Sequence, residues 1–166
     1  MPLVILVILG DLHSIKEIGS GRSGPVFVSI IQDKKVAIKI ADISKRPDVE
    51  MEEMEMINEV GIYRFLKELQ GVTIPQLVHF EYVTEGLLAL ITEFAGSSLK
   101  LKDMTDEVKQ QAIDSLRSLH RCGVLHGDVR PSWLIDFGFS RRILNDDEDE
   151  AECEMQSLRL MLNLEE

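Results

Sequence analysis

A glycine-rich turn near the start of the chain constrains the fold more than any other feature. Residues 19–26 read Gly-Ser-Gly-Arg-Ser-Gly-Pro-Val, which is the spacing G-x-G-x-x-G-x-V. Glycines let backbone amides approach phosphate oxygens closely because no Cβ intervenes. A dinucleotide-binding loop would continue directly into a helix, whereas residues 26–31 are mostly apolar and indicate a strand. We therefore expect a hairpin turn that covers phosphates, although an ordinary glycine-rich turn has the same pattern.

The rest of the chain divides into a β-rich part and a helical part. Short apolar or β-branched runs predict strands at residues 15–18, 26–31, 36–40, 77–83 and 87–94. Apolar residues at helical spacing predict helices over residues 50–70, 106–121 and 151–164. We expect one domain over residues 1–166, with a β-rich lobe at about 12–95, a hinge near Ala95 and a reduced helical lobe at about 96–166. A cleft between two such parts is a usual place for a ligand.

A lysine and a glutamate form the second chemical feature. Lys39 ends the strand sequence Val-Ala-Ile-Lys. A lysine in a strand can reach solvent along its stem, but so soon after a glycine-rich turn we interpret it as a charge directed at phosphates. Glu59 lies one turn before Tyr63, on or beside the apolar face of the predicted helix, and can hold the ammonium group. Three other acidic residues of this helix could compete and are expected on its solvated face: Glu52, Glu53 and Glu55.

Two aspartates in short motifs complete the pattern. Asp128 lies in His-Gly-Asp-Val-Arg-Pro, and Asp136 begins Asp-Phe-Gly. In phosphoryl transfer, one carboxylate accepts or orients the substrate hydroxyl and another holds Mg²⁺ against the phosphates. Each motif alone is common by chance. The four features in this order, on the expected strand, helix and loops, together indicate one phosphoryl-transfer site.

With these motifs, residues 14–140 resemble the eukaryotic protein-kinase superfamily, and most of all small fungal kinase-like proteins with His-Gly-Asp in the catalytic loop. The resemblance implies an α+β, bilobal protein-kinase-like fold, with one long helix in a β-rich N-lobe and a reduced α-helical C-lobe. It implies a Ser/Thr-type phosphotransferase that moves the γ-phosphate of ATP to a protein hydroxyl. ATP and Mg²⁺ are the implied cofactors, and an unknown protein is the implied substrate or partner.

The same resemblance assigns roles to individual residues. Asp128 is the expected catalytic base, Asp136 the expected Mg²⁺ ligand, and Lys39 the expected partner of Glu59. The residues expected to bind ATP are Gly19, Ser20, Gly21, Arg22, Gly24, Val26, Ala37, Lys39, Thr92, Glu93, Phe94 and Ala95.

Within that set, the glycines cover the phosphates, while Val26 and Ala37 lie against the adenine. Thr92 is the expected gatekeeper residue. The backbone of residues 93–95 forms the expected hinge that reads the edge of the adenine.

The chain departs from the family pattern in the catalytic loop. Gly127 replaces the arginine of His-Arg-Asp, and Arg130 stands where Ser/Thr kinases usually have lysine, which keeps the charge but not the shape. The family's Mg²⁺-binding asparagine, five residues after the catalytic aspartate, is Trp133 here. The interval up to Asp136 is roughly a dozen residues short of the family's β-hairpin. Since an extended chain spans at most ~3.3–3.6 Å per residue, this interval cannot contain that hairpin.

Composition limits the classes of partner that the chain is expected to bind. The formal net charge is −11, with 29 acidic against 18 basic residues, which argues against nucleic-acid binding. The apolar run at residues 3–9 is too short to span a membrane and is predicted to be a leading strand. The acidic block at residues 146–150 is expected to be a solvated linker, and Cys122 and Cys153 are expected to be buried or half-buried thiols. We expect no membrane partner and an intracellular, cytoplasmic location.

Three functions remain open at this point. The first is an active protein kinase. The second is a pseudokinase that binds nucleotide or acts as an interaction module, which the missing asparagine and hairpin favour. The third is a small-molecule kinase, which shares His-Gly-Asp but fits the Val-Ala-Ile-Lys strand and the hinge less well.

Overall fold

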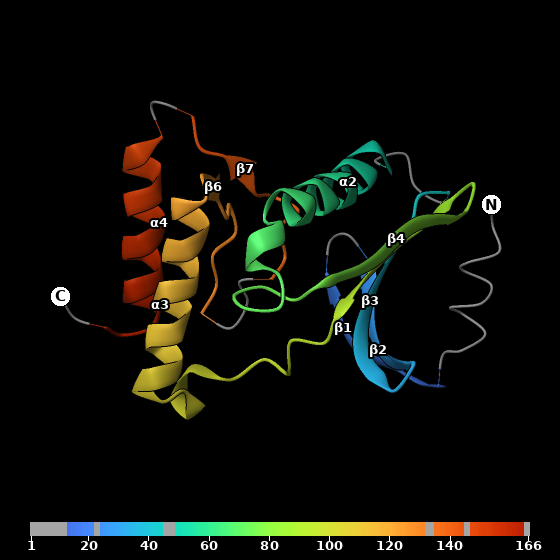
Figure 1. The fold of residues 1–166 in the computed structure, drawn as a ribbon, viewed down its shortest axis with the longest axis horizontal. Coiled ribbons are helices and arrows are strands. Elements are labelled where there is room, and N and C mark those ends of the chain that lie inside the picture. The colour runs from blue at the N-terminus through green and yellow to red at the C-terminus, as the bar shows by residue number, and fades with distance from the viewer. Residues whose placement is uncertain (1–12, 22–23, 45–48, 132–134, 145–146, 165–166) are drawn as a thin grey trace.

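The computed structural model describes residues 13–21, 24–44, 49–131, 135–144 and 147–164. Three of the sequence-based expectations lie outside these residues: the leading strand at 3–9, Arg22 and Trp133. Figure 1 shows a twisted sheet on one side, helices α3 and α4 packed side by side on the other, and helix α2 between them. The predicted α+β, protein-kinase-like fold is confirmed.

The sheet has five antiparallel strands in the order β1-β2-β3-β5-β4. Their bounds are β1 His13–Gly21, β2 Gly24–Ile31, β3 Lys34–Asp42, β4 Leu77–Thr84 and β5 Leu87–Glu93. All five predicted strands are therefore present, and the first three extend further than their apolar runs. Antiparallel pairing continues through the polar ends of these strands because the backbone ladder does not depend on side-chain polarity.

Helix α2, Val49–Phe65, packs on one face of the sheet. Its side chains Met56 and Val60 are buried against Ala41, Leu88 and Leu90 of the neighbouring strands β3 and β5. This cluster anchors α2 to the sheet and fixes which side chains of the helix face the chemical site.

The predicted C-terminal end of this helix, at Gln70, was wrong. The α-helix ends at Phe65 and is followed by a short 3-10 helix, Lys67–Leu69. The Gln70 side chain folds back, so that its Nε2 donates to the carbonyl of Tyr63 at 2.7 Å while its Oε1 accepts from the amide of Leu77 at 2.9 Å. Because one side chain satisfies an orphan helix carbonyl and the next strand, the helix ends before Gly71.

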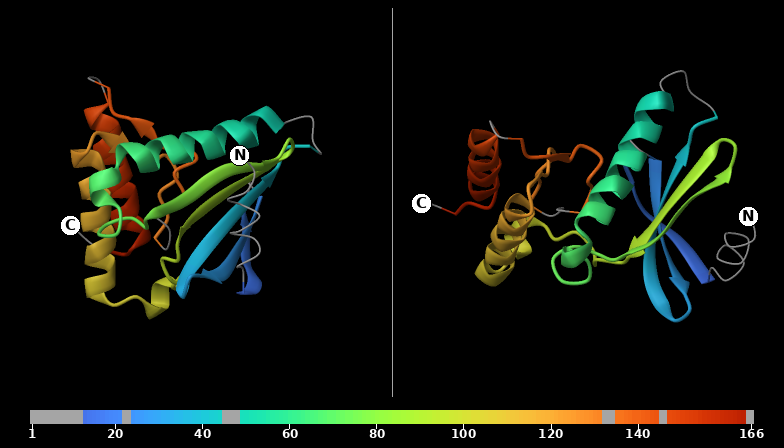
Figure 2. Two further views of the ribbon diagram at one scale, coloured as in Figure 1. Left: turned by 45° about the vertical axis from the view of Figure 1, so that its right-hand side comes forward. Right: turned by 45° about the horizontal axis from the view of Figure 1, so that its top comes forward.

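The helical part contains α3, Asp106–Arg121, and α4, Glu148–Met161. The bounds of α3 match the prediction, because the Thr105 side chain accepts from the amide of Val108 at its start and Gly123 adopts φ +77° just after its end. Helix α4 begins and ends three residues earlier than predicted. Figure 2 shows α3 and α4 standing beside α2, away from most of the sheet.

Arg141 pairs with acidic residues at the start of α4. Its guanidinium pairs with Asp147 and, at 2.6 Å, with Glu150. The acidic block is therefore partly ordered as the first turn of a helix, and the expectation of a solvated linker was wrong for these residues. Both cysteines are exposed, which also contradicts the prediction.

A small two-stranded sheet links the helical part to the centre of the molecule. Strand β6, Val124–Leu125, pairs with β7, Arg141–Arg142. This pairing brings the chain just after the Asp-Phe-Gly motif back to the strand that leads into the loop that carries Asp128. None of the described helices is long and apolar enough to cross a lipid bilayer.

Candidate functional site

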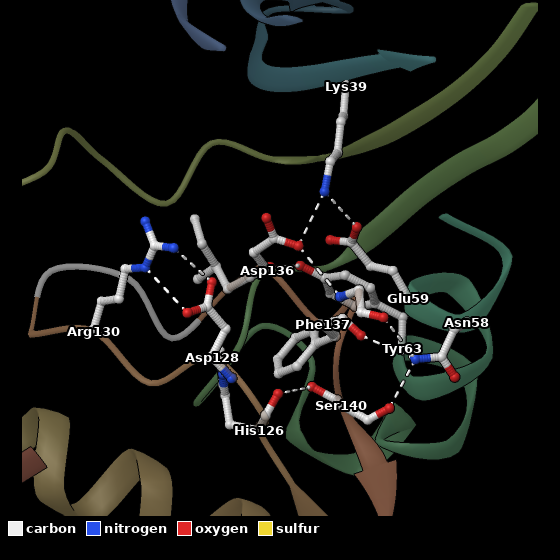
Figure 3. Close-up of polar contacts among 12 residues, drawn as sticks. Lys39, Asn58, Glu59, Tyr63, His126, Asp128, Arg130, Asp136, Phe137 and Ser140 are labelled. Atoms are coloured by element: carbon white, nitrogen blue, oxygen red, sulfur yellow. Dashed lines mark hydrogen bonds and ion pairs between the residues drawn. The ribbon is translucent and has the colours of Figure 1, made fainter. Parts of the chain in front are cut away.

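Three charged side chains converge where α2, β3 and the Asp-Phe-Gly segment meet (Figure 3). Lys39 Nζ lies 2.8 Å from Glu59 Oε2 and 3.0 Å from Asp136 Oδ1. The lysine and glutamate side chains are 11% and 4% exposed, whereas that of Asp136 is 50% exposed. The structure therefore joins the strand lysine, the helix glutamate and the second aspartate, which are far apart in sequence.

Burial and mutual attraction compete in this cluster. Burial lowers the pKa of Lys39, but the charges of Glu59 and Asp136 outweigh that effect and leave the pKa above its usual value. Burial raises the pKa of Glu59 to about 7, against the opposing attraction of Lys39. Burial also acts to raise the pKa of Asp136, but Lys39 and the amide of Gly138 hold it below its usual value. One ammonium therefore serves two carboxylates, and burial makes the deeper one, Glu59, easier to protonate than an exposed glutamate.

The strand register explains why Lys39 faces α2. Registered partners on antiparallel strands share a face of the sheet. Lys39 pairs with Val26 on one side and with Leu90 on the other, and Leu90 is buried against α2. Ala37 pairs with Thr92 and, two residues before Lys39, lies on the same face. Val26, Ala37 and Thr92 are half-buried and lie outside the cluster that packs on α2.

Two backbone amides of the expected hinge are hydrogen-bonded within the protein. The amide of Glu93 donates to the carbonyl of Gln76 at 2.9 Å, and that of Phe94 donates to the carbonyl of Lys35 at 3.1 Å. Lys35 Nζ also lies 4.1 Å from the centre of the Phe94 ring. Ala95, the next residue, is exposed. The segment is thus pinned to the sheet at two amides immediately before the chain leaves it.

The glycine-rich turn joins β1 and β2. Gly19 and Ser20 pair with Val26 and Pro25. Gly24 has φ +112°, and a Cβ there would lie 1.9 Å from the carbonyl oxygen of Ile40. Gly24 is therefore required for the close approach of β2 to β3, whatever else the turn binds. Gly21 pairs with Gly24 at the last described position before Arg22.

Asp128 lies in the loop between β6 and the undescribed residues 132–134. Its carboxylate accepts from both Arg130 Nε at 3.2 Å and an Arg130 terminal nitrogen at 2.9 Å. The Asp128 amide lies 3.3 Å from His126 Nδ1, so the fully buried imidazole accepts from the backbone. The predicted catalytic base is therefore held in a two-point ion pair with the arginine that replaces the family's lysine (Figure 3).

Phe137 fills the space between α2 and this loop. It is fully buried, with its ring centre 5.1 Å from that of Tyr63 and 5.4 Å from that of His126. The Tyr63 hydroxyl donates to the carbonyl of Ile135 at 3.3 Å. The aromatic contact holds Asp136 on the side of Lys39 and packs the segment against the helical core.

Glu154 is a site residue that the sequence did not reveal. From α4, its carboxylate accepts from the amides of His126 at 3.0 Å and Gly127 at 2.6 Å, and from His120 Nε2 at 2.8 Å. Burial acts to raise the pKa of Glu154, but these donors hold it below its usual value. A single glutamate in an acidic helix gives no signal by itself, so this clamp on the loop was missed.

Comparison with known proteins identifies the family. The protein kinase domain profile matches residues 12–158, which is most of the chain. The chain belongs to the protein kinase family. The family's members use ATP and usually Mg²⁺, and they act on a protein substrate.

Curated relatives of this kinase domain are distant and longer. A probable serine/threonine-protein kinase of Dictyostelium discoideum is 27% identical over 158 residues, which cover 83% of this chain and 32% of the relative. A serine/threonine-protein kinase of Candida albicans is 28% identical over 151 residues, covering 76% of this chain and 12% of the relative. Serine/threonine-protein kinase 36 of Mus musculus is 25% identical over 150 residues, which cover 78% of this chain and 11% of the relative. The chain thus spans about a third or less of the length of these relatives.

One departure from the protein kinase pattern and one wrong expectation about α2 both involve the backbone of residues 138–139. Gly127 has φ +81°, and a Cβ there would lie 2.2 Å from the carbonyl oxygen of Phe139. The arginine of the family motif therefore does not fit this backbone unless Phe139 moves. Glu55, expected on a solvated face, is 8% exposed, and its Cβ lies 3.5 Å from the Cβ position of Gly138. That expectation was wrong because the Asp-Phe-Gly segment covers this turn of α2.

Of the two other acidic residues, only Glu53 can be placed. Glu53 is half-buried and accepts from the Tyr82 hydroxyl at 2.6 Å, and the side chain of Glu52 lies outside the description. Within the described parts of the chain, no group of three or more His, Cys, Asp or Glu side chains forms a metal cage.

Proposed function

We propose that this protein kinase domain binds ATP against the sheet face that carries Val26, Ala37 and Thr92, and transfers its γ-phosphate to a serine or threonine hydroxyl of a protein. The observation that carries this proposal is the position of Lys39 Nζ, 2.8 Å from Glu59 and 3.0 Å from Asp136. A cation held by two carboxylates at the edge of a half-buried apolar surface is suited to a nucleotide, whose base is apolar on its faces and whose phosphates are anionic.

Each residue then has a separate task. Lys39 directs a positive charge at the phosphates, and Glu59 fixes its position because their ion pair is buried. The half-buried Val26, Ala37 and Thr92 would lie against the adenine. Since the amides of residues 93 and 94 are engaged within the fold, the adenine edge is assigned to the carbonyl of Glu93 and the backbone of Ala95.

The chemistry of Asp136 fits a magnesium ion bound together with phosphate. Mg²⁺ in such sites is usually held by one or two carboxylates and the phosphates of the nucleotide rather than by a full protein cage. The Asp136 side chain is half exposed, and one of its oxygens points away from Lys39 (Figure 3). When bound, Mg²⁺ and ATP supply the charge-neutralised γ-phosphate for transfer. The depressed pKa of Asp136 keeps its carboxylate ionised for this role.

Asp128 is the proposed base for the acceptor hydroxyl. Its carboxylate is half-buried and paired with Arg130. The planar guanidinium makes two parallel bonds to this carboxylate. In the proposed reaction the same guanidinium also faces the transferred phosphate, so that Asp128 is freed to accept the hydroxyl proton.

A pseudokinase remains the second candidate, and one sequence observation favours it. Trp133 occupies the position of the family's second Mg²⁺ ligand. Because catalysis of phosphoryl transfer rests almost entirely on positioning and electrostatics, loss of that ligand would leave nucleotide binding intact while reducing transfer strongly.

Transfer of labelled γ-phosphate separates the two candidates. Wild-type protein, Mg²⁺ and a mixture of serine- and threonine-containing peptides should yield labelled peptide, and Asp128→Ala should reduce the rate by about 10²-fold or more. Asp103→Ala, which changes an exposed aspartate outside the site, should keep the wild-type rate. Equal labelling by wild type and Asp128→Ala would overturn the proposal of transfer by this site. ATP binding without labelling would favour the pseudokinase.

A further inference from the structure

Asn58 of α2 contacts the backbone of the Asp-Phe-Gly segment. Its Nδ2 lies 2.7 Å from the carbonyl oxygen of Ser140, 3.1 Å from that of Gly138 and 3.3 Å from that of Phe137. Figure 3 shows this side chain reaching from the helix across to Ser140. One side-chain amide therefore contacts the backbone of this segment at three positions.

The chemistry of these contacts fixes the orientation of the amide. All three partners are carbonyl oxygens, which only accept hydrogen bonds, so the NH₂ group and not the amide oxygen of Asn58 must face them. Two protons shared among three acceptors require one bifurcated bond. A side chain of the same shape without donors would point an oxygen at three carbonyl oxygens and repel them.

The segment that Asn58 holds also has hydrogen bonds of its own. Within it, the Gly138 amide donates to Asp136 Oδ1 at 3.2 Å and the Ser140 amide donates to the Phe137 carbonyl at 3.1 Å. The Ser140 hydroxyl donates to the carbonyl of His126 at 2.7 Å, which ties its far end to the catalytic loop. These bonds shape a turn, and the bonds from Asn58 place that turn relative to α2.

Asn58 directly precedes Glu59, so two consecutive residues of α2 both act on the Asp136 segment. Glu59 fixes Lys39, which holds the carboxylate of Asp136, while Asn58 fixes the backbone just after it. We propose that Asn58 is a positioning residue that orients Asp136 toward Mg²⁺ and phosphate by holding the backbone of residues 137–140 against α2. This inference rests on the proposed function.

An isosteric substitution tests this role. Asn58→Asp keeps the shape but removes both donors, and Asn58→Ala removes the donors without adding charge. The matched control is Gln110→Glu, the same amide-to-acid change at an exposed residue of α3, whose Nε2 donates to Asp114 at 3.2 Å. Circular dichroism of each variant, before binding is measured, checks that the fold is retained.

Two measurements give the outcome. Hydrogen–deuterium exchange of the amides of residues 138–140 should speed up about tenfold in both Asn58 variants, more in Asn58→Asp, while the amides of α3 keep their rates. The strengthening of ATP binding by Mg²⁺, measured by calorimetry, should fall about tenfold in Asn58→Asp, while ATP affinity without Mg²⁺ stays within about twofold. Gln110→Glu should match wild type in both.

The failures are distinguishable. Unchanged exchange in Asn58→Asp would show that Asn58 does not hold the segment, and faster exchange with an unchanged Mg²⁺ effect would reduce it to a purely structural contact; either result overturns the inference alone. Wild-type protein whose ATP affinity ignores Mg²⁺ would overturn the Mg²⁺-dependent part of the proposed function, and the inference with it.

Discussion

At the scale of single residues, the site is a balance between burial and pairing. The ammonium of Lys39 faces two carboxylates, and the deeper of these, Glu59, has its pKa raised to about 7 by burial. Breaking such a buried pair by removing one partner is costly, because the remaining charge is left without compensation. The same burial that makes the cluster rigid therefore also makes it sensitive to pH.

The pH dependence of stability should reveal the raised pKa of Glu59. Its folded pKa of about 7 lies above the unfolded value of about 4.3, so the folded state binds more protons between these values. The free energy of unfolding should therefore fall as pH rises from 5 to 7, by up to about 1.4 kcal/mol per pH unit from this group.

Glu59→Gln cannot titrate at this position and removes that slope. Urea unfolding of both proteins at pH 5, 6, 7 and 8 gives the difference, in which the other titrating groups cancel. A wild-type stability that rises relative to Glu59→Gln over pH 5–7 would contradict the assignment.

Gly127 offers a second residue-scale test. Gly127→Ala combines a strained φ of +81° with a Cβ placed 2.2 Å from the Phe139 carbonyl oxygen, and should destabilise the fold by about 2 kcal/mol or more. Gly127→Arg, which restores the family's motif, should be destabilised at least as much. The control is Gly123→Ala, at φ +77° with nothing within 4 Å of the added Cβ, which should cost about 1 kcal/mol. Equal losses of unfolding free energy at the two glycines would show that the Phe139 carbonyl moves aside without an energetic cost.

At the scale of elements, α4 acts on the catalytic loop through Glu154. Removing its charge in Glu154→Gln leaves a backbone amide of the loop facing an NH₂ group, and should lower the free energy of unfolding by about 1–3 kcal/mol. Glu152→Gln, an exposed neighbour on the same helix, should change it by less than about 0.5 kcal/mol. Equal values for the two variants, measured by urea unfolding, would argue against the clamp.

Elements were predictable where their signals were local. The helix α3 followed from apolar residues at helical spacing, and the strands followed from apolar runs. The end of α2 was missed because it depends on a Gln70 side chain that bonds to residues seven positions away on either side. Glu154 and Asn58 were missed for the same reason, since their partners are remote in sequence.

At the scale of the whole molecule, α2 joins the β-rich and helical parts. Its buried side chains pack on the sheet through Met56 and Val60, and further along on the helical core through Tyr63 and Leu66. Lys39 comes from the sheet, Glu59 from α2 and Asp136 from the segment held against the helical part. The convergence of these three side chains was predictable from the order of the motifs, because each motif lies on the element that the family resemblance requires.

The affinity for ATP in the presence of Mg²⁺, measured by calorimetry on wild type and Lys39→Met, tests the central claim most directly. Methionine keeps much of the lysine stem but removes the charge, so the account predicts that wild type binds and that Lys39→Met binds at least about tenfold more weakly. Equal affinity of the two proteins, or no binding by wild type, would contradict the convergence of these groups on a nucleotide.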